Sequence, residues 1–162
     1  MNRHIAIYPG SFDPFTNGHM DIVRRGLEIF DNVIIAIALN SDKNSLFSVA
    51  ERIEMISRLV ADNPRVQVDA FDGLLVDYVV NKEARVILRG LRAVTDFEFE
   101  FQLAQMNHTV CEQAETLFMM TAPEFAFLSS SIVKEVGRLG GDISKFVPAL
   151  VLEELQKKFA ES

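Results

Sequence analysis

Three short segments of the sequence combine residue types that bind phosphate groups. The first is Thr16-Asn17-Gly18-His19, the second is Arg89-Gly90-Leu91-Arg92 and the third is Ser129-Ser130-Ser131. Arginine binds phosphate oxygens through two parallel hydrogen bonds, and histidine, serine hydroxyls and free backbone N–H groups are further donors. These segments predict binding of a polyphosphate and stabilisation of negative charge during a phosphoryl or nucleotidyl transfer.

The rest of the sequence has the pattern of a parallel sheet with crossover helices. Short apolar runs alternate with segments of helical period, which predicts an α/β fold with an open five-stranded parallel sheet and helices on both faces. The predicted strands are 5–8, 33–39, 66–71, 85–88 and 116–121. The predicted helices are 20–30, 49–60, 74–80, 96–108 and, after the fifth strand, 130–139 and 148–159. A Ser48-x-x-Glu51 capping box begins the second helix, and Gly140-Gly141 ends the fifth.

Open parallel sheets bind ligands outside the carboxyl ends of their strands, so the segments that follow the strands are where a site is expected. The segment 9–19 after the first strand is long, rich in turn residues and ends where a helix begins. Gly18 permits close approach of the backbone, and His19 adds a donor beside the free N–H groups of the helix start. We predict His19 at the centre of the site. The alternative is that Thr16 only caps the helix and His19 is an ordinary first-turn residue.

The other strand ends supply cations, hydroxyl groups and aromatic rings. Lys43 lies in the polar loop after the second strand, where it can reach an anion or stay solvated. Arg89 and Arg92 follow the fourth predicted strand, and they either hold two phosphate groups or pair with the acidic residues of 96–100. The segment 125–131 places aromatic rings and serines at a helix start, which suits a nucleotide base and a triphosphate, or merely caps a helix.

The composition excludes several classes of protein. With 16 Lys+Arg against 23 Asp+Glu, the net charge of -7 argues against a duplex nucleic-acid partner, because such binding needs clustered basic charge. Cys111 is the only cysteine, the N-terminus lacks a signal-peptide pattern, and the longest apolar run, 33–39, is too short to span a membrane. We expect one domain of residues 1–162 in a reducing cytoplasm, with no nucleic-acid or membrane partner.

Common motifs of other nucleotide-binding enzymes are missing. Neither G-x-G-x-x-G nor the G-x-x-x-x-G-K-[ST] phosphate loop occurs, which argues against hydride transfer and P-loop hydrolysis. Paired Cys/His residues with metal-ligand spacing are also missing. We therefore expect no metal ligands from the protein and Mg²⁺ that arrives with the nucleotide.

The fourth predicted helix carries phenylalanines on two faces. Phe97 and Phe101 share one face and Phe99 points nearly opposite, because successive helical residues turn by about 100°. A crossover helix has only one sheet to cover, so the second face is expected to line a ligand pocket or a subunit interface. The alternative is a phenylalanine that lies under a loop.

Longer motifs around these segments resemble a known family. The segments 16–19, 89–92 and 129–134 resemble the nucleotidylyltransferase superfamily that carries a T/H-x-G-H motif. A closer similarity is to the bacterial phosphopantetheine adenylyltransferases. It rests on Tyr-Pro-Gly-Ser-Phe-Asp-Pro at 8–14, on Ile-Leu-Arg-Gly-Leu-Arg-Ala-Val at 87–94 and on Asp-Phe-Glu at 96–98. The similarity covers essentially the whole chain.

The resemblance implies a Rossmann-like fold and the penultimate step of coenzyme A synthesis. In that reaction ATP and 4′-phosphopantetheine give 3′-dephospho-coenzyme A and pyrophosphate. The resemblance also implies Mg²⁺, a homohexamer and feedback inhibition by coenzyme A.

Matching positions imply roles for individual residues. His19 contacts the ATP phosphates as the catalytic residue, Ser11 contacts both substrates, and Lys43, Leu75 and Arg89 bind phosphopantetheine. The positions implied for ATP are Ser11, Phe12, His19, Gly90, Leu91, Arg92, Glu100, Phe125, Ala126, Phe127, Leu128, Ser129, Ser130 and Ser131. Three positions depart from the family pattern: Ser11 replaces threonine, Phe125 replaces tryptophan or tyrosine, and Asn44 replaces a second lysine beside Lys43.

The chemistry agrees with direct transfer. A substrate phosphate is already anionic at neutral pH, so its oxygen can attack the α-phosphorus of ATP without a general base or a covalent enzyme intermediate. One rival hypothesis is nucleotidyl transfer to another phosphate, such as nicotinamide mononucleotide or glycerol phosphate. A second is a flavodoxin-like phospho-acceptor module. Asp72 follows the third strand as such a module requires, but segment 8–11 lacks the acidic pair expected after the first strand.

Overall fold

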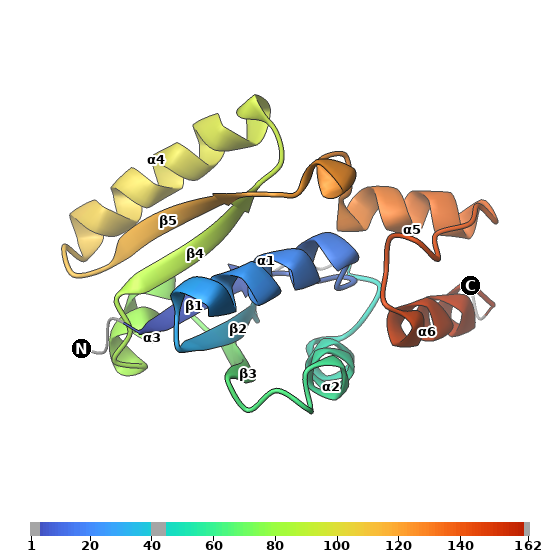
Figure 1. Ribbon diagram of the computed structural model, residues 1–162, viewed down its shortest axis with the longest axis horizontal. Coiled ribbons are helices and arrows are strands. Elements are labelled where there is room, and N and C mark those ends of the chain that lie inside the picture. The colour runs from blue at the N-terminus through green and yellow to red at the C-terminus, as the bar shows by residue number, and fades with distance from the viewer. Residues whose placement is uncertain (1–3, 40–44, 161–162) are drawn as a thin grey trace.

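Five parallel strands in the order β3-β2-β1-β4-β5 form the centre of the structure, a computed structural model that describes residues 4–39 and 45–160 (Figure 1). The strands are β1 Ile5–Gly10, β2 Asn32–Ala38, β3 Val66–Phe71, β4 Val86–Leu91 and β5 Glu115–Met120. The helices are α1 Asn17–Ile29, α2 Val49–Leu59, α3 Leu75–Asn81, α4 Val94–Val110, α5 Ser130–Arg138 and α6 Ala149–Ala160. The predicted α/β, Rossmann-like fold is confirmed.

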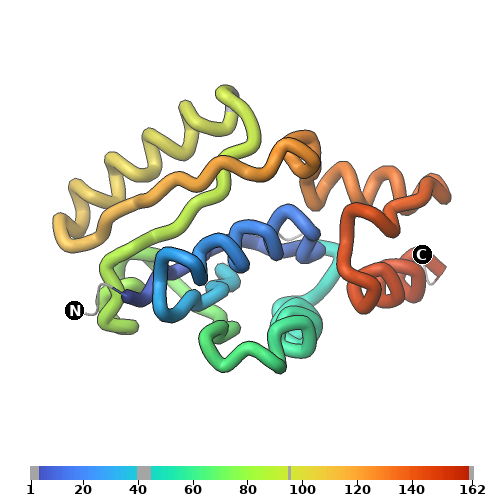
Figure 2. Tube along the Cα trace, viewed as in Figure 1, coloured from blue at the N-terminus to red at the C-terminus, as the bar shows by residue number. Residues whose placement is uncertain are grey.

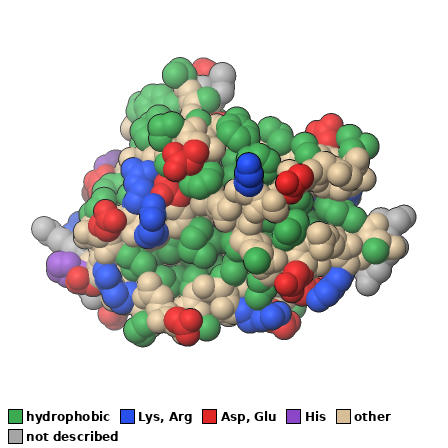
Figure 3. Space-filling model, turned by 45° about the vertical axis from the view of Figure 1, so that its right-hand side comes forward, with side chains coloured by type: hydrophobic (Ala, Val, Ile, Leu, Met, Phe, Trp, Pro, Cys, Tyr) green, Lys and Arg blue, Asp and Glu red, His purple; other side chains and the backbone are tan. Residues whose placement is uncertain are grey.

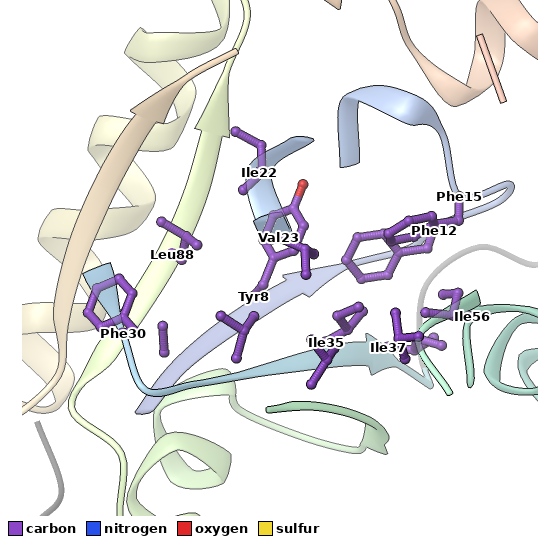
Figure 4. Packing of buried hydrophobic residues seen from close by; sticks show 14 of the residues in the cluster. Tyr8, Phe12, Phe15, Ile22, Val23, Phe30, Ile35, Ile37, Ile56 and Leu88 are labelled. Atoms are coloured by element: carbon purple, nitrogen blue, oxygen red, sulfur yellow. The ribbon is translucent and has the colours of Figure 1, made fainter. Parts of the chain in front are cut away.

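Alternate residues of β2, which lies between β1 and β3, face opposite layers of helices. Val33, Ile35 and Ile37 of β2 pack in a cluster with α1 and α2, whereas Ile34 and Ala36 pack in a cluster with α3. Both faces of β2 are covered, which is why the strand is an almost unbroken apolar run. The packing around Tyr8, Phe12 and Phe15 on the α1 face appears in Figure 4.

The two C-terminal helices lie beyond the end of the sheet. After β5 the chain leaves the sheet, forms the 3-10 turn Pro123–Phe125 and runs on to α5 and α6 (Figure 2). These helices share a third apolar cluster with Phe47 and Met55. The turn was not predicted from the sequence, because a single 3-10 turn has no periodic pattern to detect.

The predicted boundaries are close, but two strands run further than predicted. β1 was predicted to end at residue 8 and continues to Gly10. The third strand, 66–71, has the predicted ends, but β4 runs to Leu91 and not to 88 as predicted. The sequence predicts a loop at Arg89 and Gly90. These residues stay in the sheet because they pair with Phe118 and Met119 of β5. Arg89 therefore projects from a strand, and only Arg92 follows it.

A topological switch point lies between β1 and β4. From β1 the chain builds the sheet toward β3 in one direction and toward β5 in the other. β1 pairs with β2 along its whole length, but with β4 only at Ala6↔Val86 and Ile7↔Ile87. The carboxyl ends of β1 and β4 thus part, and such a crevice is the place where open α/β sheets bind ligands.

Candidate active site

A cavity of about 470 Å³ lies at this switch point. Its walls come from the ends of β1 and β4, from the first two turns of α1 and α4 and from the start of α5. The predicted site residues on its walls are Ser11, Phe12, His19, Arg89, Gly90, Arg92, Glu100, Phe125, Leu128, Ser129, Ser130 and Ser131. The structure thus brings together all three segments that the sequence predicts to bind phosphate.

His19 takes part in the capping box that begins α1. The hydroxyl of Thr16 accepts a hydrogen bond from the His19 N–H at 3.3 Å, and the Thr16 N–H donates to Nδ1 of the imidazole at 3.0 Å. A nitrogen that accepts carries no proton, so the neutral ring holds its proton on Nε2. The capping alternative and the functional prediction are therefore compatible. The cap fixes the ring through Nδ1, and Nε2–H has no partner among the described residues and can donate to a ligand.

The surroundings keep this imidazole uncharged. Burial, and then the nearby guanidinium groups of Arg92 and Arg89, lower the pKa of His19 to about 4. Phe12 and Phe15 hold the ring in place, with centroids 5.1 and 5.4 Å from that of His19. At neutral pH the group is a hydrogen-bond donor of fixed direction.

Gly10 is required by the way Phe12 is placed. Phe12 has a positive φ of 51° and is almost completely buried. A Cβ at position 10 would lie 2.8 Å from the Phe12 ring, which is closer than real Cβ contacts. The glycine therefore permits the loop to fold its aromatic residue back under the cavity.

Asp13 anchors the same loop to two other segments. Its carboxylate accepts hydrogen bonds from the Leu46 and Phe47 N–H groups at 2.9 Å each and from Lys134 Nζ of α5 at 2.6 Å. Asp13 is buried, so these three donors replace the water that the charge has lost. Arg52 of α2, also buried, donates to the Ser11 carbonyl at 2.6 Å.

The serine run divides its hydroxyl groups between structure and cavity. Ser129 caps α5 by accepting from the Ile132 N–H at 3.1 Å, and Ser130 donates to the Pro14 carbonyl at 2.8 Å. Ser131 is exposed on the cavity wall. The free N–H groups at the start of α5 therefore face the same space as His19.

Both arginines are paired with carboxylates on α4. Arg89 binds Glu100 through Nε at 2.7 Å and through a second nitrogen, and its third donor reaches the Pro9 carbonyl at 2.7 Å. Arg92 binds Asp96 through Nε at 3.0 Å and Nη2 at 3.2 Å, and donates to the Leu128 carbonyl at 3.1 Å. The alternative that these arginines answer the acidic residues of α4 is confirmed for Glu100 and Asp96, although both arginines also line the cavity.

A second cavity of about 230 Å³ adjoins the first. It is lined mainly by apolar groups of α3, α4 and the sheet, including Leu75, Leu103 and Ala104. Ser11, Arg89 and Glu100 line both cavities. The site therefore has a polar chamber and an apolar chamber that meet at one arginine.

Comparison with known proteins agrees with this geometry. The model of the cytidylyltransferase-like family matches residues 7–136. A phosphopantetheine adenylyltransferase of Geobacter metallireducens is 61% identical, with 99% of each chain covered. The phosphopantetheine adenylyltransferase of Syntrophotalea carbinolica is 59% identical over 100% of this chain and 98% of the relative. The chain belongs to the phosphopantetheine adenylyltransferase family. It is a nucleotidyltransferase of coenzyme A biosynthesis.

Some residues that the family resemblance implies lie away from the polar chamber. Leu91 is buried in the sheet, and Ala126 and Phe127 lie outside both cavity walls, with Phe127 packed edge-on against Phe146. Leu75 lines the apolar chamber. Lys43 and Asn44 lie outside the described residues. The roles of these positions stay predictions.

Other cavity residues were missed from the sequence. The polar chamber is also lined by Tyr8, Asp96 and Phe99. The sequence had placed Phe99 on a second helix face that lines a pocket or an interface, which was the right signal for it. Tyr8 lies on β1 and Asp96 on α4, so neither lies in the loops where the sequence predicts the site.

Within 4–39 and 45–160, no three His, Cys, Asp or Glu side chains come together as a possible metal site. None of the described helices has the length and apolar character needed to cross a bilayer.

Proposed function

We propose that this nucleotidyltransferase transfers the adenylyl group of ATP to 4′-phosphopantetheine, giving 3′-dephospho-coenzyme A and pyrophosphate. The observation that carries the proposal is the pair of chambers that meet at Arg89. The polar chamber, with His19 and the helix starts of α1 and α5, suits a triphosphate. The apolar chamber, with Leu75 at its wall, suits the pantetheine arm, whose phosphate would then lie near Arg89.

The reaction follows from this arrangement. An oxygen of the acceptor phosphate forms a bond to the α-phosphorus while the bond from that phosphorus to the bridging oxygen of the β-phosphate breaks, and pyrophosphate leaves with the electron pair. His19, as a neutral Nε2–H donor, stabilises the charge that develops on the α-phosphate, and Arg92 and the serines hold the outer phosphates. The acceptor carries no proton that must be removed, so a general base and a covalent intermediate are unnecessary.

We include Mg²⁺ in the proposal as a cation that enters with ATP. Mg²⁺ keeps most of its waters and is often held by substrate phosphates and one or two carboxylates. The carboxylates on the polar chamber, Asp96 and Glu100, are each paired with an arginine. A cation coordinated mainly by phosphate and water fits these residues, and when bound it would neutralise charge on the triphosphate.

The assay uses the purified protein with ATP, Mg²⁺ and 4′-phosphopantetheine, followed by detection of pyrophosphate and dephospho-coenzyme A. We expect both products in equal amounts. Parallel reactions contain nicotinamide mononucleotide or glycerol phosphate as acceptor, or CTP as donor. Faster turnover with any of these substitutes would refute the proposed substrates while leaving the family assignment intact.

We also propose that the protein is a homo-oligomer, with the family's hexamer as the expected size. α4 has large apolar side chains on the surface, including Val94, Phe99, Met106 and Val110. Hydrophobic side chains also gather in the middle of the face in Figure 3, with charged groups mostly around them. Light scattering should give a mass well above 18.2 kDa at micromolar concentration. A monomer alone would refute this part.

Feedback inhibition by coenzyme A and a cytoplasmic location complete the proposal. Coenzyme A shares the pantetheine arm with the acceptor, so the apolar chamber is the expected place for competition. A shift of the acceptor KM by added coenzyme A tests the first point, and cell fractionation tests the second.

A further inference from the structure

Tyr8 places an uncommitted hydroxyl group in the floor of the polar chamber. The ring is buried, with its centroid 5.3 Å from that of Phe12 and 6.4 Å from that of His19. In Figure 4 the hydroxyl points away from the centre of the core, toward Ile22 of α1. A Cβ built on Gly90 would lie 3.8 Å from this oxygen, which places it between α1 and β4 at the switch point.

The hydroxyl makes no hydrogen bond to any residue within 4–39 and 45–160. The chain's other tyrosine, Tyr78, behaves in the opposite way, because its hydroxyl donates to Asp69 at 2.9 Å on the other face of the sheet. A phenol on a buried ring usually finds a partner. The Tyr8 oxygen is not among the fully enclosed unpartnered atoms of the described residues, so it opens into the cavity. An uncommitted hydroxyl on a cavity wall therefore indicates a partner that enters the cavity.

We propose that Tyr8 is a substrate-binding residue whose hydroxyl donates a hydrogen bond to a phosphate oxygen of the bound nucleotide. Arg89, Arg92 and His19 line the same chamber, so the hydroxyl faces a region built for anions. This inference rests on the proposed function, because it takes ATP as the ligand.

The ionisation state of Tyr8 suits a donor. Burial raises the pKa of the Tyr8 hydroxyl above its ordinary value, although Arg89 and then Arg92 lower it in part. The group keeps its proton at every pH at which the enzyme would work. Gly90 leaves space beside the Tyr8 hydroxyl. A Cβ at position 90 would lie 3.2 Å from the Ile22 side chain and would fill part of this space.

The test compares Tyr8→Phe with Tyr78→Phe by calorimetric titration of ADP, inorganic pyrophosphate and adenosine. Tyr8→Phe keeps the ring contacts with Phe12 and His19 and removes only the donor. A hydrogen bond to a charged oxygen predicts that ADP binding weakens roughly tenfold, with adenosine binding and the KM for 4′-phosphopantetheine unchanged. Pyrophosphate affinity weakens with ADP if the oxygen belongs to an outer phosphate. It stays constant if the oxygen belongs to the α-phosphate. Thermal stability should not fall, because no bond within the protein is lost.

Tyr78→Phe is the matched control. It should lose stability, because its hydroxyl bond to Asp69 is removed, and it should bind ADP normally. Unchanged ADP affinity in Tyr8→Phe, an equal loss for ADP and adenosine, or a loss of stability with normal affinity would each overturn the inference. Failure of the unmodified protein to bind ADP would instead refute ATP as the substrate, and with it the inference.

Discussion

The two sides of the polar chamber are built in different ways. On the β1–α1 side, Phe12, Asp13, Phe15 and Thr16 are all nearly inaccessible to solvent, and the capping box fixes His19 from within its own turn. On the α4 side, the arginines are held by carboxylates, and the helix starts without a side-chain cap. One side is therefore set by packing, and the other by ion pairs that can exchange partners.

This difference suggests a division of labour in the reaction. A donor that stabilises a transition state gains most when it is already oriented, because no reorganisation is then needed as charge develops. An arginine paired with a carboxylate can instead turn to a substrate phosphate while its partner moves into solvent. We expect the β1–α1 side to govern kcat and the α4 side to govern substrate affinity.

The largest expected effect comes from removing the anchor of the packed side. Asp13→Ala would leave Lys134 and two N–H groups without their carboxylate, so the free energy of unfolding should fall by about 3–5 kcal/mol. Urea unfolding measures the loss. Glu154→Ala, which breaks the exposed pair with Lys157, is the control and should have a much smaller effect. Equal losses in the two variants would show that the packed side does not depend on this ion pair.

The next effect separates catalysis from capping at His19. His19→Ala should lower kcat by at least about 10²-fold, or some 2.7 kcal/mol, with a much smaller change in ATP binding. It should also lose about 1 kcal/mol of stability, because the Thr16 N–H loses its acceptor.

His19→Gln is the matched control for that variant. Glutamine at this position of a capping box can still accept from the N-cap, so stability should recover while kcat stays low. A His19→Ala enzyme with nearly normal kcat, or a trapped nucleotidyl-histidine in the unmodified protein, would contradict the assigned role.

A smaller effect is expected on the ion-paired side. Lysine in place of either arginine keeps the charge but loses the planar fork. Since Arg89 lines both chambers and Arg92 only the polar one, Arg89→Lys should mainly raise the KM for phosphopantetheine and Arg92→Lys that for ATP, each by about tenfold. Steady-state kinetics with each substrate varied in turn measures both. Equal changes of the two KM values in both variants would refute the division.

The sequence predicted the parts of the molecule that depend on local patterns. The apolar run of β2 and the Ser48-x-x-Glu51 box carry their structure in neighbouring residues, and both were predicted correctly. The first helix was predicted from residue 20 but begins at Asn17, and Thr16 caps it as the alternative interpretation had it. The end of β4 was missed because Arg89 and Gly90 stay in the sheet through pairing with β5.

Long-range contacts account for the rest of what was missed at the site. Nothing near Asp13 in the sequence indicates that its partners are Leu46, Phe47 and Lys134. Nor does the sequence around Tyr8 show that its hydroxyl meets a cavity between α1 and β4. The pairing of both arginines with α4 was foreseen as an alternative, and the structure shows that it coexists with a place on the cavity wall.

Nuclear magnetic resonance of the His19 ring nitrogens tests most directly the claim that a neutral, preset imidazole lies at the centre of the site. The chain has three histidines, and the signals that His19→Ala removes identify this one. We predict a neutral ring at pH 7 with its proton on Nε2, and no protonation until the pH approaches about 4. In the unfolded chain the ring binds a proton near pH 6.5, so the group makes the fold less stable as pH falls between these values. A charged ring at pH 7, or a proton on Nδ1, would contradict the account.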